Sequence, residues 1–426
     1  MKVTNAQELA EAINSGELNI EIEGTIKGSP SITLPEGATL SGGTLEFTAK
    51  GVRLTANNTL RDVVIKTTDY EVAIYNDTSL TDAGTFTLNN VTTVGQIYII
   101  AEGNLKTARV EADQVTVAAA DVRGRVEQPH GFGVDVLQGG FTLWNRNSDP
   151  ESLFTATLKG INIGSEESPV RGSGLFVDGY TDREGKLTGG KFTADLIETG
   201  TVVTDGGIAP GTPDKISGGV FVLGGAIVEK VVNSGPVTTH GQNDMVLDLW
   251  GKTESWVANA PITSTGPSGI GFVNFGDMGN LEINAPVVTS GLGARGFNVY
   301  DGYVKSAKFQ SITTHGDGAI GIQVSKPMGT IEVVEDVHTT GAEGLSLVKG
   351  VQMTLKAIGV SIKPGGELEG LSVGGNVITE ADDLVSFEVL KGAKISKLSL
   401  VGIESRGKNS VASLVEGEIL EGSADF

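Results

Sequence analysis

Aromatic, acidic and amide side chains recur at matching positions in the middle of this chain. Aromatic rings offer flat platforms for sugar rings, and amides and acids can hold sugar hydroxyls. A carboxyl group among them, Asp248 or Asp301, could supply the acid or base of a cleavage reaction. The aromatic residues are Trp250, Phe275 and Tyr300, and the polar residues are Asp248, Asn298 and Gln323 in one column and Asp301 and Lys326 in another.

A glycine repeat explains this spacing. Segments such as VTTHG (237–241), ITSTG (262–266) and ITTHG (312–316) return every 25 residues, and a degenerate sixth copy is IKPGG (362–366). A fixed period of this size indicates a solenoid, in which each repeat is one coil stacked on its neighbours. The repeated glycines are Gly241, Gly266, Gly291, Gly316, Gly341 and Gly366.

Apolar residues form further columns in the same repeat. Stacked coils place equivalent positions above one another at about 4.8 Å, so each apolar column is predicted to be a ladder inside the coil. The column of Asp248, Asn298 and Gln323 alternates with the inner ladder and is therefore predicted to face solvent. The inner columns are Val237, Ile262, Val287, Ile312, Val337 and Ile362; Leu247, Phe272, Phe297, Ile322 and Leu347; and Met245, Ile270, Arg295, Ile320 and Leu345. Arg295 interrupts the last column and is predicted to pair with a buried acid.

The predicted fold is an all-β, right-handed parallel β-helix of about 25-residue coils, preceded by a capping helix. Asn5 and Glu8 form a capping box, Ala6, Leu9, Ala10 and Ile13 give an apolar face, and Gly16 ends the helix. One domain is expected over residues 1–426. Its parts are a capping helix (1–16), irregular coils with insertions (17–236), regular coils (237–366) and C-terminal coils (367–426).

Two stretches resemble known proteins. The segment ELAEAINSG, followed by IEIEGTI and SITLPEGATLSGGTLEF, resembles the start of the pectate-lyase-like single-stranded β-helix proteins. Segments within 205–366, such as GPSGIGFVNFG and GARGFNVYDG, look like a group of bacterial β-helix proteins of unassigned activity. These resemblances imply a β-helix fold and a bacterial origin, and they imply no particular chemistry.

The composition of the chain argues against several classes of binding partner. The net charge of −21 argues against nucleic acid, which needs a basic footprint. No stretch of apolar residues is long enough for membrane insertion, and residues 1–18 do not read as a signal peptide, which leaves a cytoplasmic protein or a secreted one without its leader. With no cysteine and four scattered histidines, no metal site and no cofactor is expected.

The function expected from these patterns is carbohydrate-directed: binding or cleavage of a polysaccharide along the groove, with any enzyme being a polysaccharide lyase or glycoside hydrolase. The alternative is a structural or adhesive rod, such as a surface or phage-derived assembly component. The sequence leaves open whether the chain forms a homo-oligomer. A second candidate region is the polar stretch 121–155, because loops on a rigid scaffold often carry function. Its residues of interest are Arg123, Arg125, Glu127, His130, Phe132, Trp144, Arg146 and Asn147.

Overall fold

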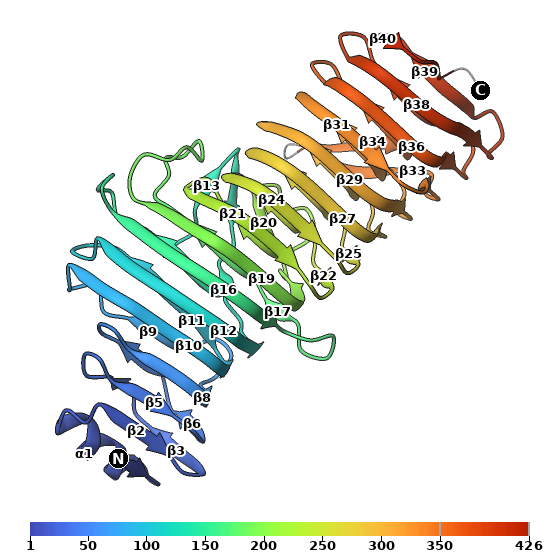
Figure 1. Cartoon of the computed structure of the whole chain (residues 1–426). Helices are drawn as coiled ribbons and strands as arrows, with labels where there is room; N and C mark the ends of the chain where they lie inside the picture. The colour runs from blue at the N-terminus through green and yellow to red at the C-terminus, as the bar shows by residue number, and fades with distance from the viewer. Residues whose placement is uncertain (349–350, 425–426) are drawn as a thin grey trace. The chain divides into compact units, whose positions relative to one another are not determined.

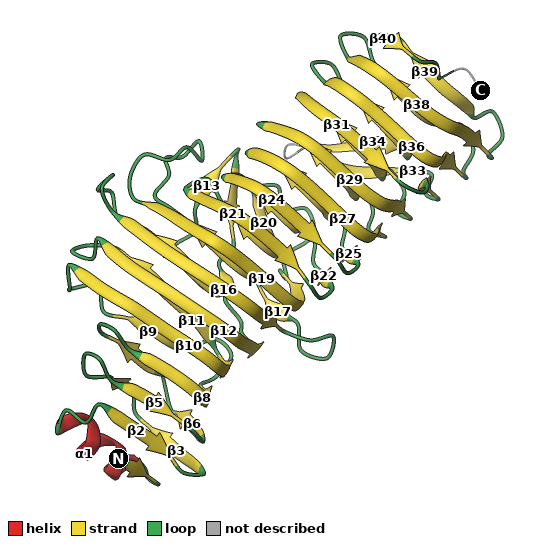
Figure 2. Ribbon diagram, in the orientation of Figure 1, coloured by secondary structure: helices red, strands yellow, loops and turns green. Residues whose placement is uncertain are grey.

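The computed structural model describes residues 1–348 and 351–424, with the side chains of Leu347 and Val348 outside this description. Most of the described chain is β-strand (Figures 1 and 2), and most of the strands pair in parallel within long sheets. The all-β parallel β-helix predicted from the sequence is confirmed. The chain divides into two compact units, Met1–Thr204 with Phe221–Glu229, and Asp205–Val220 with Lys230–Phe426.

Near the start of the first unit is the predicted helix, α1 (Ala6–Asn14), which lies beside β2 (Asn19–Ile22) and β3 (Thr25–Ser29) in Figure 1. The side chain of Asn5 accepts a hydrogen bond from the Glu8 backbone N–H at 3.0 Å, as an N-cap should. The helix buries Leu9 and Ala12, whereas Ala10 is exposed, so the predicted apolar face is wrong at Ala10. Helical spacing alone did not determine whether Ala10 or Ala12 joins Leu9 on the helix face that packs against the coils.

Long strands in this unit turn a corner partway along their length. Asp62, Asn90 and Gln114 have positive φ angles of 51°, 51° and 55° in the middle of their strands. Side chains at these corners also bond across coils, since Asn90 Nδ2 donates to Asp62 Oδ1 at 2.8 Å. The long strands are β8 (Thr59–Lys66), β10 (Asp82–Val94), β12 (Thr107–Ala119), β16 (Leu153–Ile163) and β19 (Lys191–Asp205).

A second set of shorter strands closes each coil of the first unit. These strands are buried along nearly their whole length, and β15 is buried at every residue. Their carboxyl ends lead into the loops described below. The set is β7 (Val52–Leu54), β9 (Val72–Asn76), β11 (Gln96–Ala101), β15 (Gly139–Asn145) and β18 (Ser173–Asp178). The remaining elements up to residue 136 are β1 (Lys2–Val3), β2 (Asn19–Ile22), β3 (Thr25–Ser29), β4 (Ile32–Thr33), β5 (Thr39–Ser41), β6 (Thr44–Phe47), β13 (His130–Gly131) and β14 (Val134–Val136).

The second unit contains the 25-residue coils. Val237 pairs with Ile262, Ile262 with Val287, Val287 with Ile312 and Ile312 with Val337, and all five side chains are fully buried. The predicted inner ladder is therefore confirmed over these coils. The strands of these coils are β22 (Val237–Thr239), β23 (Asp244–Leu249), β24 (Lys252–Ala258), β25 (Ile262–Ser264), β26 (Ile270–Asn274), β27 (Asp277–Thr289), β28 (Arg295–Val299), β29 (Tyr303–Thr314), β30 (Ile320–Val324), β31 (Pro327–Val333) and β32 (Val337–Thr339).

The regular spacing ends after β32, and the predicted sixth repeat is wrong. Val337 pairs with Val377, and Ile362 pairs instead with Val324 in the other sheet. The cause is an inserted antiparallel hairpin of β33 (Glu343–Val348) and β34 (Val351–Lys356). Leu345, predicted to lie in the core, is on this hairpin and is 52% exposed, and the predicted place of Leu347 lies outside the described side chains.

The coil resumes after the hairpin. Ile358 takes the core-ladder place predicted for Leu345, because it pairs with Ile320. The sequence carries a signal for this, since IGFVN (270–274), IGIQV (320–324) and IGVSI (358–362) share their first two residues. The later strands are β35 (Ile358–Ile362), β36 (Glu367–Thr379), β37 (Val385–Val389), β38 (Lys394–Ser405), β39 (Val411–Val415) and β40 (Glu418–Glu421).

Candidate functional site

The predicted aromatic column of the second unit exists as a ladder of rings. Trp250, Phe275 and Tyr300 each follow a strand, in the turn that joins it to the next one. The ring centroids of Trp250 and Phe275 are 6.0 Å apart, and those of Phe275 and Tyr300 are 5.4 Å apart in a stacked arrangement. Trp250 is buried, while Phe275 and Tyr300 are partly exposed.

The polar column beside it does not face solvent, and that prediction is wrong. Asp248 and Asn298 are fully buried, and Gln323 is 7% exposed. Alternation along a strand exposes one face only where that face is open, and β23 is buried at every residue. Burial raises the pKa of Asp248 well above its ordinary value, which the nearby Trp250 indole only partly offsets. Asp248 is therefore an enclosed group that bulk solvent does not reach, and its burial favours the protonated form.

The remaining predicted residues, Asp301 and Lys326, lie at the surface. The Lys326 ammonium and the Asp301 carboxylate are 3.4 Å apart, and the two side chains are 47% and 48% exposed. An exposed ion pair of this kind contributes about 0–1 kcal/mol to stability. The predicted face thus offers two partly exposed rings and one surface ion pair, while its amides and its first acid are enclosed.

A hollow with a volume of about 750 Å³ lies on the first unit. Two segments line it, one from the 121–155 region that the sequence marked as a second candidate and one from the loop after β18. Aromatic, acidic, basic and hydroxyl groups meet there. Its lining residues are Val126, Glu127, Gln128, Pro129, His130, Asp135, Trp144, Arg146, Gly179, Tyr180, Thr181, Asp182, Arg183 and Thr188.

Trp144 and Arg146 come from β15 and the residue beyond it, so a rigid strand positions them. The Trp144 indole N–H donates to the Gly179 carbonyl oxygen at 3.1 Å. The Arg146 guanidinium carbon lies 4.9 Å from the centre of the Trp144 ring, and its Nη1 contacts the Tyr98 hydroxyl and the Glu102 carboxylate, each at 3.2 Å. These contacts hold a ring and a cation in fixed relative positions.

His130 and Asp135 face one another across a short hairpin. They are partners in the antiparallel pairing of β13 with β14, and His130 Nδ1 lies 2.7 Å from Asp135 Oδ1. Both side chains are about one-third exposed and both line the hollow. The hairpin therefore presents an imidazole oriented by a carboxylate, an arrangement that suits proton transfer.

A network around the buried side chains of Gln96 and Gln138 holds this hairpin against the coils. Arg125 Nε donates to Gln96 Oε1 at 2.8 Å, and Arg125 Nη2 donates to the Tyr70 carbonyl oxygen at 2.9 Å. Gln96 Nε2 donates to Gln138 Oε1 at 3.0 Å, and Gln138 Nε2 donates to the Glu127 carbonyl oxygen at 2.7 Å. Burial lowers the pKa of Arg125. Both ends of the hairpin loop are thereby anchored to the same glutamine pair.

The second lining segment was not identified from the sequence. It follows β18 and reads DGYTDREG (178–185). Tyr180 is 37% exposed, and Asp182 accepts backbone hydrogen bonds from Glu184 and Lys186 at 2.9 and 3.0 Å, which closes a tight turn. A turn signature with an aromatic residue directly after a buried strand was the available clue.

A buried carboxyl group, Asp178, stands at the end of β18 where this segment begins. Asp178 Oδ1 accepts hydrogen bonds from the backbone N–H groups of Gly179 at 2.8 Å and Gly225 at 3.0 Å. Asp178 is fully buried, and desolvation raises its pKa to about 7 against the opposing effect of those two bonds. Its neighbour Gly179 lines the hollow, so Asp178 fixes the start of the second segment.

Other residues of the 121–155 region have structural contacts. Arg123 forms an ion pair with Asp121 at 2.5 Å. Asn147 is buried and donates to the Leu105 carbonyl oxygen at 2.9 Å. Phe132 is 38% exposed at the tip of the hairpin. The structure therefore brings Glu127, His130, Trp144 and Arg146 together in the hollow.

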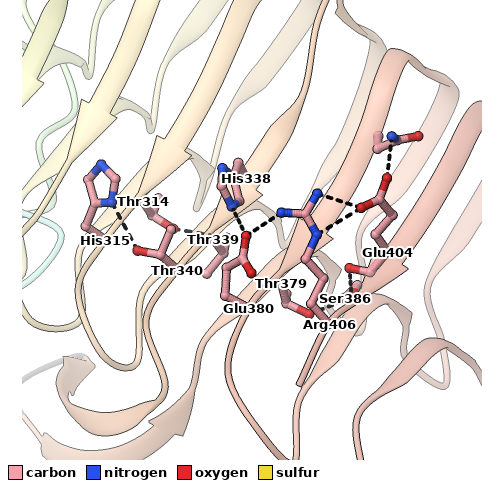
Figure 3. Close-up of polar contacts among 11 residues, drawn as sticks. Thr314, His315, His338, Thr339, Thr340, Thr379, Glu380, Ser386, Glu404 and Arg406 are labelled. Carbon is pink, nitrogen blue, oxygen red and sulfur yellow. Dashed lines mark hydrogen bonds and ion pairs between the residues drawn. The ribbon is translucent and has the colours of Figure 1, made fainter. Parts of the chain in front are cut away.

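The second unit carries a polar network on its surface, shown in Figure 3. The Arg406 guanidinium lies between Glu380 and Glu404, with an N–O distance of 2.7 Å to each, and His338 Nε2 lies 2.8 Å from Glu380 Oε1. The pKa of Glu380 is lowered, first by His338 and then by Arg406. His315 and Thr340 form a separate contact at 3.0 Å. The charged and polar groups of this network pair with one another, and we interpret the network as a set of surface contacts that link neighbouring coils.

Comparisons with protein-family profiles, curated proteins and solved structures find no match to this chain. Among the described residues, no three histidine, cysteine or carboxylate side chains come together in a way that could hold a metal ion. No helix within the described part of the chain is long and apolar enough to cross a membrane. The geometry of the hollow is therefore the basis for assigning a function.

Proposed function

We propose that this chain is carbohydrate-directed and binds a glycan in the hollow of the first unit. The observation that carries this proposal is the meeting of Trp144 and Tyr180 with fixed polar groups in one space of about 750 Å³. Pockets of this size accommodate small ligands or a few sugar units. The Tyr180 ring, which is 37% exposed, supplies an apolar face for a sugar ring, while the buried Trp144 ring lines the hollow beneath Arg146. The surrounding donors and acceptors suit hydroxyl groups.

The hollow supports this function better than the aromatic ladder of the second unit. Around the ladder, Asp248 and Asn298 are enclosed and cannot hold a hydroxyl group of a bound sugar. Around the hollow, the carboxylate of Asp135 and the side chains of His130 and Tyr180 are partly exposed. We also propose descent from pectate-lyase-like bacterial proteins, supported by the N-terminal helix followed by stacked parallel coils.

A glycan array with the full chain, followed by calorimetry on the best ligand, tests the proposal. Tyr180→Ala should weaken binding at least about tenfold, which corresponds to about 1.4 kcal/mol. Tyr300→Ala is the matched control, because it removes a partly exposed tyrosine from the other candidate face. Loss of binding only in Tyr300→Ala would move the site to the ladder, and no binding by the unaltered chain would overturn the proposal.

A structural or adhesive role is the second candidate, and exposed apolar side chains near residues 401–420 favour it. Val401 is 66% exposed, Leu420 is 58% exposed and Leu414 is 40% exposed. Apolar groups gathered at a surface often mark protein contacts. If the chain assembles through them, sedimentation of the unaltered chain should show a concentration-dependent oligomer that the Leu414→Lys, Leu420→Lys double variant does not form. A monomer at all concentrations would contradict this role.

A further inference from the structure

The hairpin of β13 and β14 is built around a strained turn. Phe132 and Gly133 occupy its two central positions, with φ angles of 51° and 86°. Two positive φ angles are typical of the tight turn that joins antiparallel strands, but a bulky residue such as phenylalanine rarely adopts one. Strain of this kind collects at functional sites, where the surrounding structure compensates for it.

The strained turn fixes the pairing of His130 with Asp135. A Nδ1–H group donating to Asp135 at 2.7 Å leaves Nε2 of His130 as a proton acceptor. A carboxylate that holds one imidazole nitrogen in this way orients the ring and stabilises the imidazolium that forms during proton transfer. The buried Gln96 and Gln138 network keeps the hairpin in place, so the dyad is pre-organised.

The surroundings of the dyad indicate the chemical class of the reacting group. Val126, which is 90% exposed, and Pro129 give the hollow a small apolar region close to His130 in sequence. Thr181, Arg183 and Thr188 line the hollow from the second segment, and they bring hydroxyl and guanidinium donors. An apolar region, a base and several donors fit a short acyl ester, with a hydrocarbon group, an attackable carbonyl carbon and an oxygen that gains charge.

We propose that His130 and Asp135 hydrolyse short O-acyl esters carried by the bound glycan, an inference that rests on the proposed carbohydrate-binding function. His130 Nε2 takes a proton from water while the water oxygen bonds to the carbonyl carbon, and the carbonyl electron pair moves to its oxygen. The tetrahedral intermediate then re-forms the carbonyl and breaks the bond to the sugar oxygen, which receives the proton from His130. A carboxylic acid and a free sugar hydroxyl result.

Cleavage of the sugar chain itself fits the hollow less well. Glycoside hydrolysis commonly uses two carboxyl groups on either side of the glycosidic bond. Of the three carboxyl groups lining the hollow, Asp135 is bonded to His130 and Asp182 accepts two backbone N–H groups within its own turn. Glu127 alone remains, so a pair of free carboxyl groups is not present in this lining.

The test measures acid release from 4-nitrophenyl acetate and from an O-acetylated polysaccharide, using the full chain. His130→Gln should lower the rate by about 10²-fold or more, because general base catalysis contributes that much. Asp135→Asn should also lower it and should alter the pH–rate profile. His315→Gln is the matched control, since His315 contacts Thr340 in the second unit. Thermal melts check that each variant folds.

The outcomes separate this inference from the proposed function. Glycan binding without acid release, or equal acid release by His130→Gln and the unaltered chain, overturns the esterase inference and leaves glycan binding standing. Formation of an unsaturated sugar, seen by its ultraviolet absorbance, would assign proton abstraction to the dyad and would also overturn ester hydrolysis. Acid release from the small ester with no binding of any glycan would contradict the proposed carbohydrate function and the glycan as carrier of the ester, and would leave ester hydrolysis by the dyad standing.

Discussion

The Trp144 indole N–H donates to the Gly179 carbonyl oxygen at 3.1 Å, which ties the strand β15 to the segment that forms the second wall of the hollow. Trp144→Phe keeps a ring but removes this donor and leaves the Gly179 oxygen without that partner. We expect a loss of about 1–3 kcal/mol in the free energy of unfolding, measured by urea denaturation.

Trp144→Phe should also weaken any glycan binding, because the segment that begins at Gly179 loses its hydrogen bond to β15. Trp256→Phe is a useful comparison, since Trp256 is likewise buried and donates to Asn233 at 2.8 Å, but in the second unit. It should lower stability without affecting the hollow. Equal effects of both variants on binding would show that Trp144 has no particular part in forming the site.

Asp178 should make stability depend on pH. Its pKa in the folded chain is about 7, above its ordinary value of 3.8, so the folded state holds this proton more tightly than the unfolded state. Stability should therefore fall as pH rises from about 4 to about 7 and then level off, with a change of about 4 kcal/mol from this group. Asp178→Asn should remove that component.

Urea denaturation of the unaltered chain and of Asp178→Asn at pH 5 and pH 8 checks this expectation. The stability of Asp178→Asn relative to the unaltered chain should be greater at pH 8 than at pH 5. Taking the difference between the two proteins cancels other groups, such as Asp244, whose pKa burial raises to about 6. A difference that does not change with pH would show that Asp178 does not titrate in this range.

Phe297 should be one of the most important core residues of the second unit. It is fully buried, and its ring centre lies 6.1 Å from that of Phe272 and 5.0 Å from that of Phe309. Phe297→Ala should cost about 3–5 kcal/mol in thermal or urea unfolding. Lys326→Ala, at an exposed ion pair, should change stability by less than about 1 kcal/mol. Similar small effects from both would contradict the assignment of Phe297 to the core.

Arg295 should be replaceable by an apolar residue with a gain in stability. It is 2% exposed, and its guanidinium donates to the Gly293 carbonyl oxygen at 2.7 Å and to the Ser346 hydroxyl at 3.4 Å. Over the described ranges 1–348 and 351–424, no carboxylate forms an ion pair with it, so the predicted buried acid is wrong. An enclosed cation without a counter-ion carries a desolvation cost.

Arg295→Met should therefore raise the free energy of unfolding by about 1 kcal/mol or more. Methionine already stands at the equivalent position 245, and Ile270 and Ile320 flank Arg295 in the ladder. Arg295→Ala is the control, since it removes the charge but leaves a cavity. A marked loss of stability in Arg295→Met would show that the contact with the hairpin of β33 and β34 outweighs the cost of burying the charge.

The sequence by itself determined the fold class and the inner ladder from Val237 to Val337. A parallel coil repeats its side-chain environments at a fixed spacing, so a 25-residue period in apolar residues specifies stacking without knowledge of distant contacts. The N-cap at Asn5 was equally local, because it depends on a hydrogen bond between residues three apart. The hairpin after Thr339 interrupted the period, which is why the sixth repeat was misplaced.

Only the tertiary structure decided which polar residues reach solvent and which meet in the hollow. Asp248 and Asp301 look alike in sequence, yet one is enclosed and the other is at the surface, because exposure depends on what packs over each strand. Likewise, His130 and Tyr180 come from separate segments whose approach depends on the Gln96 network and on the bonds from Gly179 and Gly225 to Asp178. Such long-range contacts leave no periodic trace in the chain.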